Sequence, residues 1–188
     1  MYRANPFLLP AIGGFLLFLL LLLPGPEIQA EEQCLKVVFN QYCLGGDIRL
    51  LQRQKPQFIH QQQEGERFAL IYGEGRERIY ILSFQNRIYK IVRKYQPATR
   101  LNYLDLKELL SSKYGIPEDS SLYPEKAKGL ASKIGAIRRG EGRALLTWKP
   151  PGEEWYLQLG WNREMGLNLA YIINRLDGKQ RMTQEEGY

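Results

Sequence analysis

The chain of 188 residues contains a single histidine and only two cysteines. A Ser-His-Asp or Cys-His catalytic arrangement would therefore have to use His60, which lies in a polar, glutamine-rich stretch. A structural zinc site would need carboxylates to complete its four ligands, and the spacing of Cys34 and Cys43 fits no zinc motif. These shortages predict that the chain binds no metal ion and favour an ordinary loop role for His60.

Motifs that bind phosphates or activate a serine are also missing. The chain has no Gly-x-Ser-x-Gly sequence and no Walker-type loop. Gly73-Glu-Gly-Arg76 lacks the third glycine of a dinucleotide fingerprint and is expected to join two strands. We therefore predict no catalytic residue and no cofactor. The alternative is a hydrolase that acts on glycans through two carboxylates, although the sequence singles out no such pair.

Charged residues are absent between residues 6 and 26, where leucine and phenylalanine fill the centre of the segment. Arg3 before this run, the helix-breaking Pro24-Gly25-Pro26 after it and the small Ala30 are typical of a signal peptide. We predict that residues 1–30 are cleaved off after Ala30, which makes the protein periplasmic or secreted. The alternative is an uncleaved membrane anchor, although the continuous apolar run is shorter than the ~20 residues of a spanning helix. With cleavage, the chain meets the membrane only during export.

Residues 31–176 are predicted to form one α+β domain of antiparallel meanders packed against helices. Strand-forming residues with turn residues at their ends occur in six segments: 67–72, 78–84, 87–95, 143–148, 154–160 and 167–173. The last segment is compatible with a helix, but its strict alternation favours a strand. Residues 177–188 lack a periodic apolar pattern, so we expect a disordered tail there.

Two helices are expected to cover these strands. Asp47 can cap a short helix over residues 48–54. Asn102 can cap a longer one, with a core face formed by Tyr103, Leu106, Leu110 and Tyr114. A weaker helix is predicted to begin at Pro124. Residues 56–66 are interpreted as a loop because they are polar and rich in glutamine.

The order of helix, linker and three strands occurs twice, in residues 34–97 and 98–176. Gly73-Glu-Gly-Arg76 also recurs as Gly140-Glu-Gly-Arg143, each time before a predicted strand. This pattern favours two tandem copies of one unit. A match this short is equally compatible with shared turn chemistry.

Basic residues exceed acidic ones by six, which favours anionic partners. Basic and aromatic residues are interleaved in the strand predicted at 87–95, and such a surface can hold sugars and anionic groups. We hypothesise a binding surface formed by Arg87, Tyr89, Arg93 and Tyr95. Its partner would be an envelope protein, an anionic glycan or a lipid headgroup, whereas nucleic acid is not expected for an exported protein. The alternative is that the tyrosines belong to the core and the charges to its rim.

Cys34 and Cys43 lie in a stretch whose apolar residues also have helical spacing. An intact helix would separate their Cα atoms by ~13 Å, whereas bridged cysteines lie within about 7 Å of each other. Export favours oxidation of the pair. We predict a disulfide, with any helical turn confined between the two cysteines. Free thiols would instead favour the helix.

Leu44-Gly-Gly-Asp-Ile-Arg-Leu-Leu-Gln-Arg-Gln-Lys-Pro56 would form a glycine-capped helix that ends at a proline before strands. It resembles the start of the outer-membrane assembly lipoproteins BamE/SmpA. The tandem plan of helix and sheet is similar to the β-lactamase-inhibitor-protein fold, in which two repeats form a concave binding surface. Both resemblances imply an exported binding or assembly module without catalytic residues. The lipid-carrying cysteine of the BamE/SmpA lipoproteins is missing here, so no lipid anchor is implied.

Overall fold

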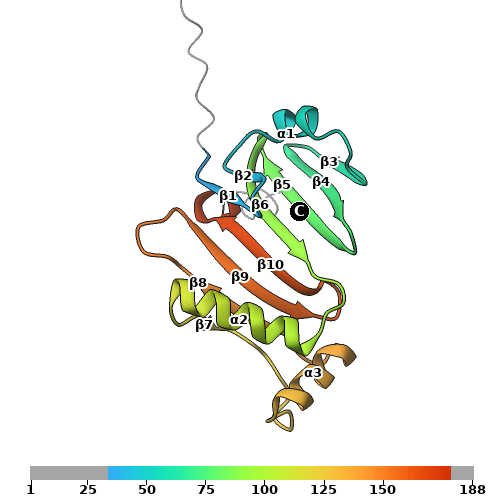
Figure 1. Cartoon of the computed structure of the whole chain (residues 1–188), viewed down its shortest axis with the longest axis vertical. Coiled ribbons are helices and arrows are strands. Elements are labelled where there is room, and N and C mark those ends of the chain that lie inside the picture. The colour runs from blue at the N-terminus through green and yellow to red at the C-terminus, as the bar shows by residue number, and fades with distance from the viewer. Residues whose placement is uncertain (1–33, 179–188) are drawn as a thin grey trace, which may run out of the picture. The chain divides into compact units, whose positions relative to one another are not determined.

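A computed structural model of the chain describes residues 34–178 (Figure 1). The predicted signal peptide, its cleavage site and residues 179–188 of the predicted tail lie outside this part. Within it, no helix has the length and apolar character needed to cross a membrane.

Helices and antiparallel strands make up the described part, which confirms the predicted α+β class. The helices are α1 (Ile48–Gln54), α2 (Arg100–Tyr114) and α3 (Leu130–Arg139). The strands are β1 (Lys36–Val38), β2 (Tyr42–Leu44), β3 (His60–Glu64), β4 (Arg67–Glu74), β5 (Glu77–Phe84), β6 (Arg87–Lys94), β7 (Glu118–Asp119), β8 (Ala144–Trp148), β9 (Trp155–Asn162) and β10 (Gly166–Ile173). The segment at 167–173 is therefore a strand, as its alternation indicated.

The eight strands β3 to β10 form one sheet in the order β3-β4-β5-β6-β10-β9-β8-β7. The sheet consists of two halves of four strands, and in each half the chain runs from an edge of the sheet to its centre. The first half is β3 to β6, which follow α1, and the second is β7 to β10, which follow α2. The halves meet where β6 pairs with β10. Each half thus has four strands, not the expected three. The two Gly-Glu-Gly-Arg sequences take different places in these halves, because Gly73 lies within β4 whereas its counterpart Gly140 ends α3.

Strand β3 occupies a segment that the sequence predicted to be a loop. All five of its residues are exposed, so it has no apolar alternation that would indicate a strand. It forms because the turn at Gly65-Glu66 folds it back onto β4, with Glu64 opposite Arg67. Gly65 has a φ of +55°, which glycine adopts readily. The loop prediction is therefore wrong for residues 60–64.

Helix α2 begins at Arg100, earlier than predicted. The Thr99 hydroxyl accepts a hydrogen bond from the backbone N–H of Asn102 at 3.1 Å, so Thr99 is the N-cap and the prediction of Asn102 is wrong. The Asn102 side chain instead donates to the carbonyl of Pro97. The predicted core face is confirmed, since Tyr103 and Leu110 are buried and both Leu106 and Tyr114 pack against the core.

The other two corrections concern segments beside helices. Pro124 starts no helix; a turn follows it, and α3 begins only after Gly129, where Ser132 hydrogen-bonds with the glycine backbone. Residues 174–178 are helical and Asp177 is buried, so the predicted tail does not begin at residue 177. At Gly129 a local contact between Ser132 and the backbone, which the periodicity does not show, marks the start of the helix.

The sheet separates two groups of buried side chains. Buried residues of α1, α2 and α3 and of the β1–β2 hairpin pack on its first face, where α2 lies across β8 and β9 in Figure 1. Trp148, Trp155 and Trp161 are buried in this core. We call the opposite side the second face. It is centred on a smaller buried cluster of Val92, Tyr156, Ala170 and Ile172, flanked by Tyr80, Leu82 and Met165.

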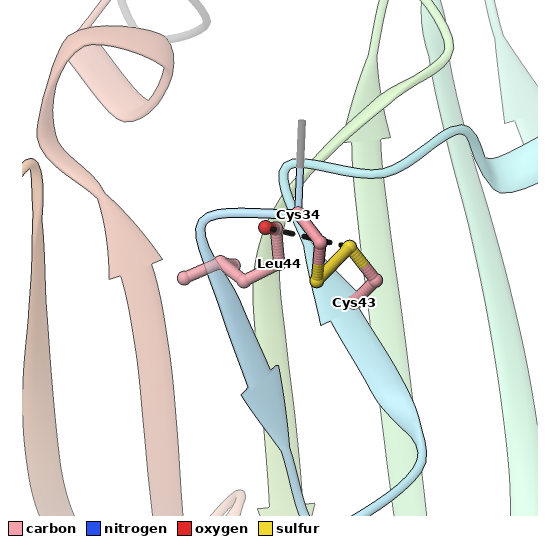
Figure 2. The surroundings of a disulfide bond; sticks show 3 residues. All are labelled: Cys34, Cys43 and Leu44. Carbon is pink, nitrogen blue, oxygen red and sulfur yellow. Dashed lines mark hydrogen bonds between the residues drawn. A yellow bond between two sulfur atoms is a disulfide. The ribbon is translucent and has the colours of Figure 1, made fainter. Parts of the chain in front are cut away.

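Cys34 and Cys43 are joined by a disulfide with their Cα atoms 5.4 Å apart, as predicted (Figure 2). The helical spacing of the apolar residues does not reflect a helical turn between the cysteines, because β1 and β2 form an antiparallel hairpin. Phe39 and Asn40 make its turn with φ values of 51° and 62°, the conformation that tight hairpins need. Val38 and Tyr42 are cross-strand partners that both enter the core, which explains their spacing in the sequence.

Candidate binding face

The four residues hypothesised to form a binding surface lie at two ends of β6. Arg87 is exposed at the start of the strand, and Tyr89 nearby is only 5% exposed. Arg93 and Tyr95 lie at the other end, with the guanidinium 5.7 Å from the centroid of the Tyr95 ring. The structure thus brings Arg93 and Tyr95 together and places Arg87 and Tyr89 elsewhere.

Arg93 is held on the first face by two carboxylates. Its guanidinium pairs with Glu77 and lies 3.6 Å from a carboxylate oxygen of Glu74. The Tyr42 hydroxyl donates a hydrogen bond to Glu74 at 3.0 Å, and burial together with this bond raises the pKa of Tyr42. Arg93 therefore stabilises the contact between the β4–β5 turn and the hairpin, and its charge is largely compensated.

A different pair of cations lies on the second face. Arg78 of β5 is directly opposite Lys94 of β6, and Lys94 is opposite Asn168 of β10. Two residues further along the same two strands, Val92 of β6 is opposite Ala170 of β10, and both belong to the second-face cluster. Because side chains alternate along a strand, Lys94 and Asn168 project from the same face. We call Arg78, Lys94 and Asn168 the cationic row.

The cationic row contains an unfavourable pairing. Like charges directly opposite each other in an antiparallel sheet are destabilising. Within residues 34–178, neither Arg78 nor Lys94 forms an ion pair that would offset the repulsion. Arg78 is exposed and Lys94 is half-buried, so both can reach a molecule lying on the face. An anion bound between them would remove the repulsion.

Neighbouring residues shape the surface around the row. Tyr80 is opposite Val92 and offers a partly exposed ring beside the charges. The Asn168 amide nitrogen donates to the carbonyl of Gly166 at 3.0 Å, which fixes the orientation of the amide. A Cβ atom on Gly160 would lie 3.1 Å from Asn168 Oδ1, so glycine at this position leaves room for that side chain.

A second cationic feature lies where β8 begins. An open depression of about 570 Å³ is lined by Leu122, Arg139, Gly140, Glu141, Gly142, Arg143, Asn162, Arg163 and Glu164. Gly140 has a φ of +81° and ends α3, and the N–H of Glu141 bonds back to the carbonyl of Ala136. This turn brings the end of α3 next to the β9–β10 turn. We call this feature the arginine depression.

Arginines outnumber glutamates three to two in the arginine depression. Arg139 binds Glu141 through two hydrogen bonds of 2.8 and 2.9 Å, and these bonds lower the pKa of Glu141. Arg163 donates to the backbone carbonyl of Arg139. Arg143 forms no ion pair within the described residues. Leu145 is opposite Gly160, itself opposite Asn168, so alternation places Arg143 on the second face beyond the cationic row.

Sequence reasoning pointed to strand β6 but named none of the three residues of the cationic row. The basic and aromatic residues of β6 drew attention to the strand, but the hypothesised residues omitted Lys94, Arg78 and Arg143. Alternation of Arg78 and Tyr80 with Ile79 and Ile81 was a usable signal, because it puts a cation and an aromatic ring together on one side of β5.

Comparison with known proteins adds little to these observations. No family model matches the sequence, and no curated protein matches it. Among solved structures, a cysteine-rich secretory protein from Staphylococcus aureus is similar with a TM-score of 0.40 and 9% identity, over 70% of this chain and 45% of that one. An extracellular protein with an SCP domain from Bacillus anthracis has a TM-score of 0.39 and 11% identity, over 81% of this chain and 50% of that one. The chain thus spans half or less of these proteins, and the values support no inference about function.

Proposed function

We propose that the chain is an exported, non-catalytic binding module whose second face binds an anionic glycan of the cell envelope. The direct opposition of Arg78 and Lys94 is the observation that carries the proposal. A carboxylate, sulfate or phosphate group between the two side chains would replace their repulsion by charge-assisted hydrogen bonds. Asn168 and Arg143 extend the same surface toward the arginine depression.

An extended glycan suits this surface better than a lipid headgroup. The cationic row spans three neighbouring strands, about 10 Å, which is longer than one unit of a sugar polymer lying on the sheet. Tyr80 beside the row offers a ring on which a sugar can stack. The apolar residues of the second face are at most 9% exposed in its central cluster, so little apolar surface is available to enter a bilayer.

Export is supported by two independent features. The apolar N-terminal segment has the pattern of a cleaved signal, and the Cys34–Cys43 disulfide fits an oxidising compartment. N-terminal sequencing of the exported protein should begin at Glu31. A chain that still begins at Met1 and stays with the membrane would instead show an uncleaved anchor.

Calorimetric titration with polygalacturonate, a carboxylate polymer, tests the binding proposal. The substitutions R78Q and K94Q together should weaken binding by about tenfold or more, because two charge-assisted hydrogen bonds are lost. The matched control R53Q/K107Q removes the same charge from exposed positions on α1 and α2 and should change binding little. Equal losses in both variants, or binding to neutral dextran as strong as to polygalacturonate, would contradict the proposal.

Vesicles of phosphatidylglycerol and phosphatidylcholine separate the glycan from a headgroup. Binding to the anionic vesicles alone, with no response to polygalacturonate, would identify a lipid headgroup as the partner. We expect the protein to bind polygalacturonate and not to bind the anionic vesicles.

A glycan hydrolase is the second candidate, because Glu141 and Glu164 both line the arginine depression. A general acid needs a raised pKa, whereas Arg139 lowers the pKa of Glu141. We therefore expect no new reducing ends when polygalacturonate is incubated with the protein. Release of reducing ends that E141Q or E164Q abolishes would establish the hydrolase.

A further inference from the structure

Strand β3 forms one edge of the eight-stranded sheet, and its outer side is open. Within residues 34–178, His60–Glu64 pairs only with β4. Edge strands are often protected by lysine or proline, and the β3 sequence His-Gln-Gln-Gln-Glu contains neither. The opposite edge is different, because β7 contains only Glu118 and Asp119, and both are acidic.

The hairpin turn determines which backbone groups of β3 face outward. Glu64 and Arg67 flank the turn at Gly65-Glu66 and close it, so they exchange hydrogen bonds with each other. Because this pattern alternates along the strand, the peptide groups of His60 and Gln62 face β4. Those of Gln61 and Gln63 face outward and remain available to another strand.

We propose that β3 pairs with β3 of a second copy of this chain, antiparallel and centred on Gln62. In this register Gln61 of each copy lies opposite Gln63 of the other, so their outward-facing N–H and C=O groups bond to one another. His60 lies opposite Glu64 of the second copy, and the imidazole can donate a hydrogen bond to the carboxylate. The edge sequence is thus complementary to itself.

Two glutamine side chains of β3 are already held in place by hydrogen bonds from α1. The Gln61 side chain accepts a hydrogen bond from Gln52 at 2.8 Å, and the Gln63 side chain accepts one from Arg49 at 3.1 Å. Both contacts come from α1 and hold the glutamines on the first face, where they do not obstruct the open edge. Because these side chains are already ordered, less conformational entropy is lost when a second strand binds.

Assembly through β3 ends at two copies. A symmetric pairing uses the same edge of each molecule, so it closes on itself and does not continue into a fibre. The remaining edges are β7 strands, whose acidic residues would oppose each other and repel.

Antiparallel pairing of this kind has its two-fold axis perpendicular to the sheet, so the second faces of both copies lie on the same side. Two cationic rows would then face one polymer, and binding would gain from multivalency. This consequence rests on the proposed function, whereas the pairing itself does not.

Sedimentation of the purified exported protein over a range of concentrations tests the pairing. The wild type should reach twice the mass of one chain. Q61P removes an outward-facing N–H and leaves the hydrogen bonds between β3 and β4, so it should abolish the dimer. H60E places like charges opposite each other at two symmetric positions and should weaken association by about tenfold. The double variant H60E/E64K makes the opposing pair complementary again and should restore the dimer.

A wild type that stays monomeric at all concentrations would overturn the proposal, as would dimers unaffected by both Q61P and H60E. Thermal unfolding and thiol titration check that each variant is folded with its disulfide intact. Q61P should still bind polygalacturonate, with the lower affinity of a single row. Failure of the dimer is therefore distinguishable from failure of the glycan proposal, which R78Q/K94Q tests separately.

Discussion

The guanidinium of Arg93 lies over the ring of Phe39, 5.3 Å from its centroid. Phe39 belongs to the turn of the disulfide-closed hairpin and also contacts Tyr171 of β10 edge-on, with ring centroids 5.7 Å apart. Arg93 pairs at the same time with Glu74 and Glu77 at the start of the β4–β5 pairing. One cation therefore holds the N-terminal hairpin against the centre of the sheet.

Replacing Arg93 by methionine should lower the free energy of unfolding by about 1–3 kcal/mol, because it leaves Glu74 and Glu77 half-buried without their shared partner. Methionine keeps much of the packing against Phe39, so the loss reports mainly on charge. Urea unfolding measures it. The control R76M removes an exposed cation from the same turn and should have little effect. Equal stability of R93M and R76M would show that the network contributes nothing.

Removal of the disulfide should cost about 2–3 kcal/mol, because the bond closes a short loop and restricts the unfolded chain. Chemical unfolding with and without a reductant measures this loss. The variant C34S/C43S should match the reduced wild type and should not respond to the reductant. A wild type equally stable in both conditions would show that the hairpin is held by its core contacts alone.

Truncation of Thr99 to alanine should lower the free energy of unfolding by ~1 kcal/mol, because the N-terminal turn of α2 loses its cap. N102A should cost less, since the Asn102 side chain makes only an exposed bond to Pro97. Thermal melts of the two variants compare them directly. A larger loss in N102A would mean that the helix starts where the sequence first suggested.

Stability should fall at alkaline pH because of buried tyrosines. Burial raises the pKa of both Tyr95 and Tyr103 from 10.0 to about 12. As the pH rises, these phenols ionise at a lower pH in the unfolded chain than in the folded one. Their contribution to the free energy of unfolding is therefore complete below pH 10 and is lost as the pH rises toward 12. Y103F should flatten this decline, and Y95F/Y103F should flatten it further. Unfolding free energies measured across this range that are parallel for all three proteins would contradict the assignment.

Local patterns predicted much of the fold. Alternation and strand-forming residues identified β4 to β6 and β8 to β10, because every second residue of these strands enters the main core. The same reasoning missed β3, because a strand that is exposed along its whole length has no alternation of apolar and polar residues. It also chose the wrong cap for α2, because Thr99 and Asn102 are both good capping residues and only the path of the chain before the helix decides between them.

The sequence by itself determined the α+β class, the strands with a buried face and the disulfide of Cys34 and Cys43. The cationic row was decided by tertiary structure alone. The two-residue turn after Phe84 would place Arg78 opposite Arg93 in a regular hairpin, but the register shifts between Leu82 and Ser83 and Arg78 faces Lys94 instead. Because side chains alternate with a period of two, one extra residue in β6 moves Lys94 to the second face and Arg93 to the first.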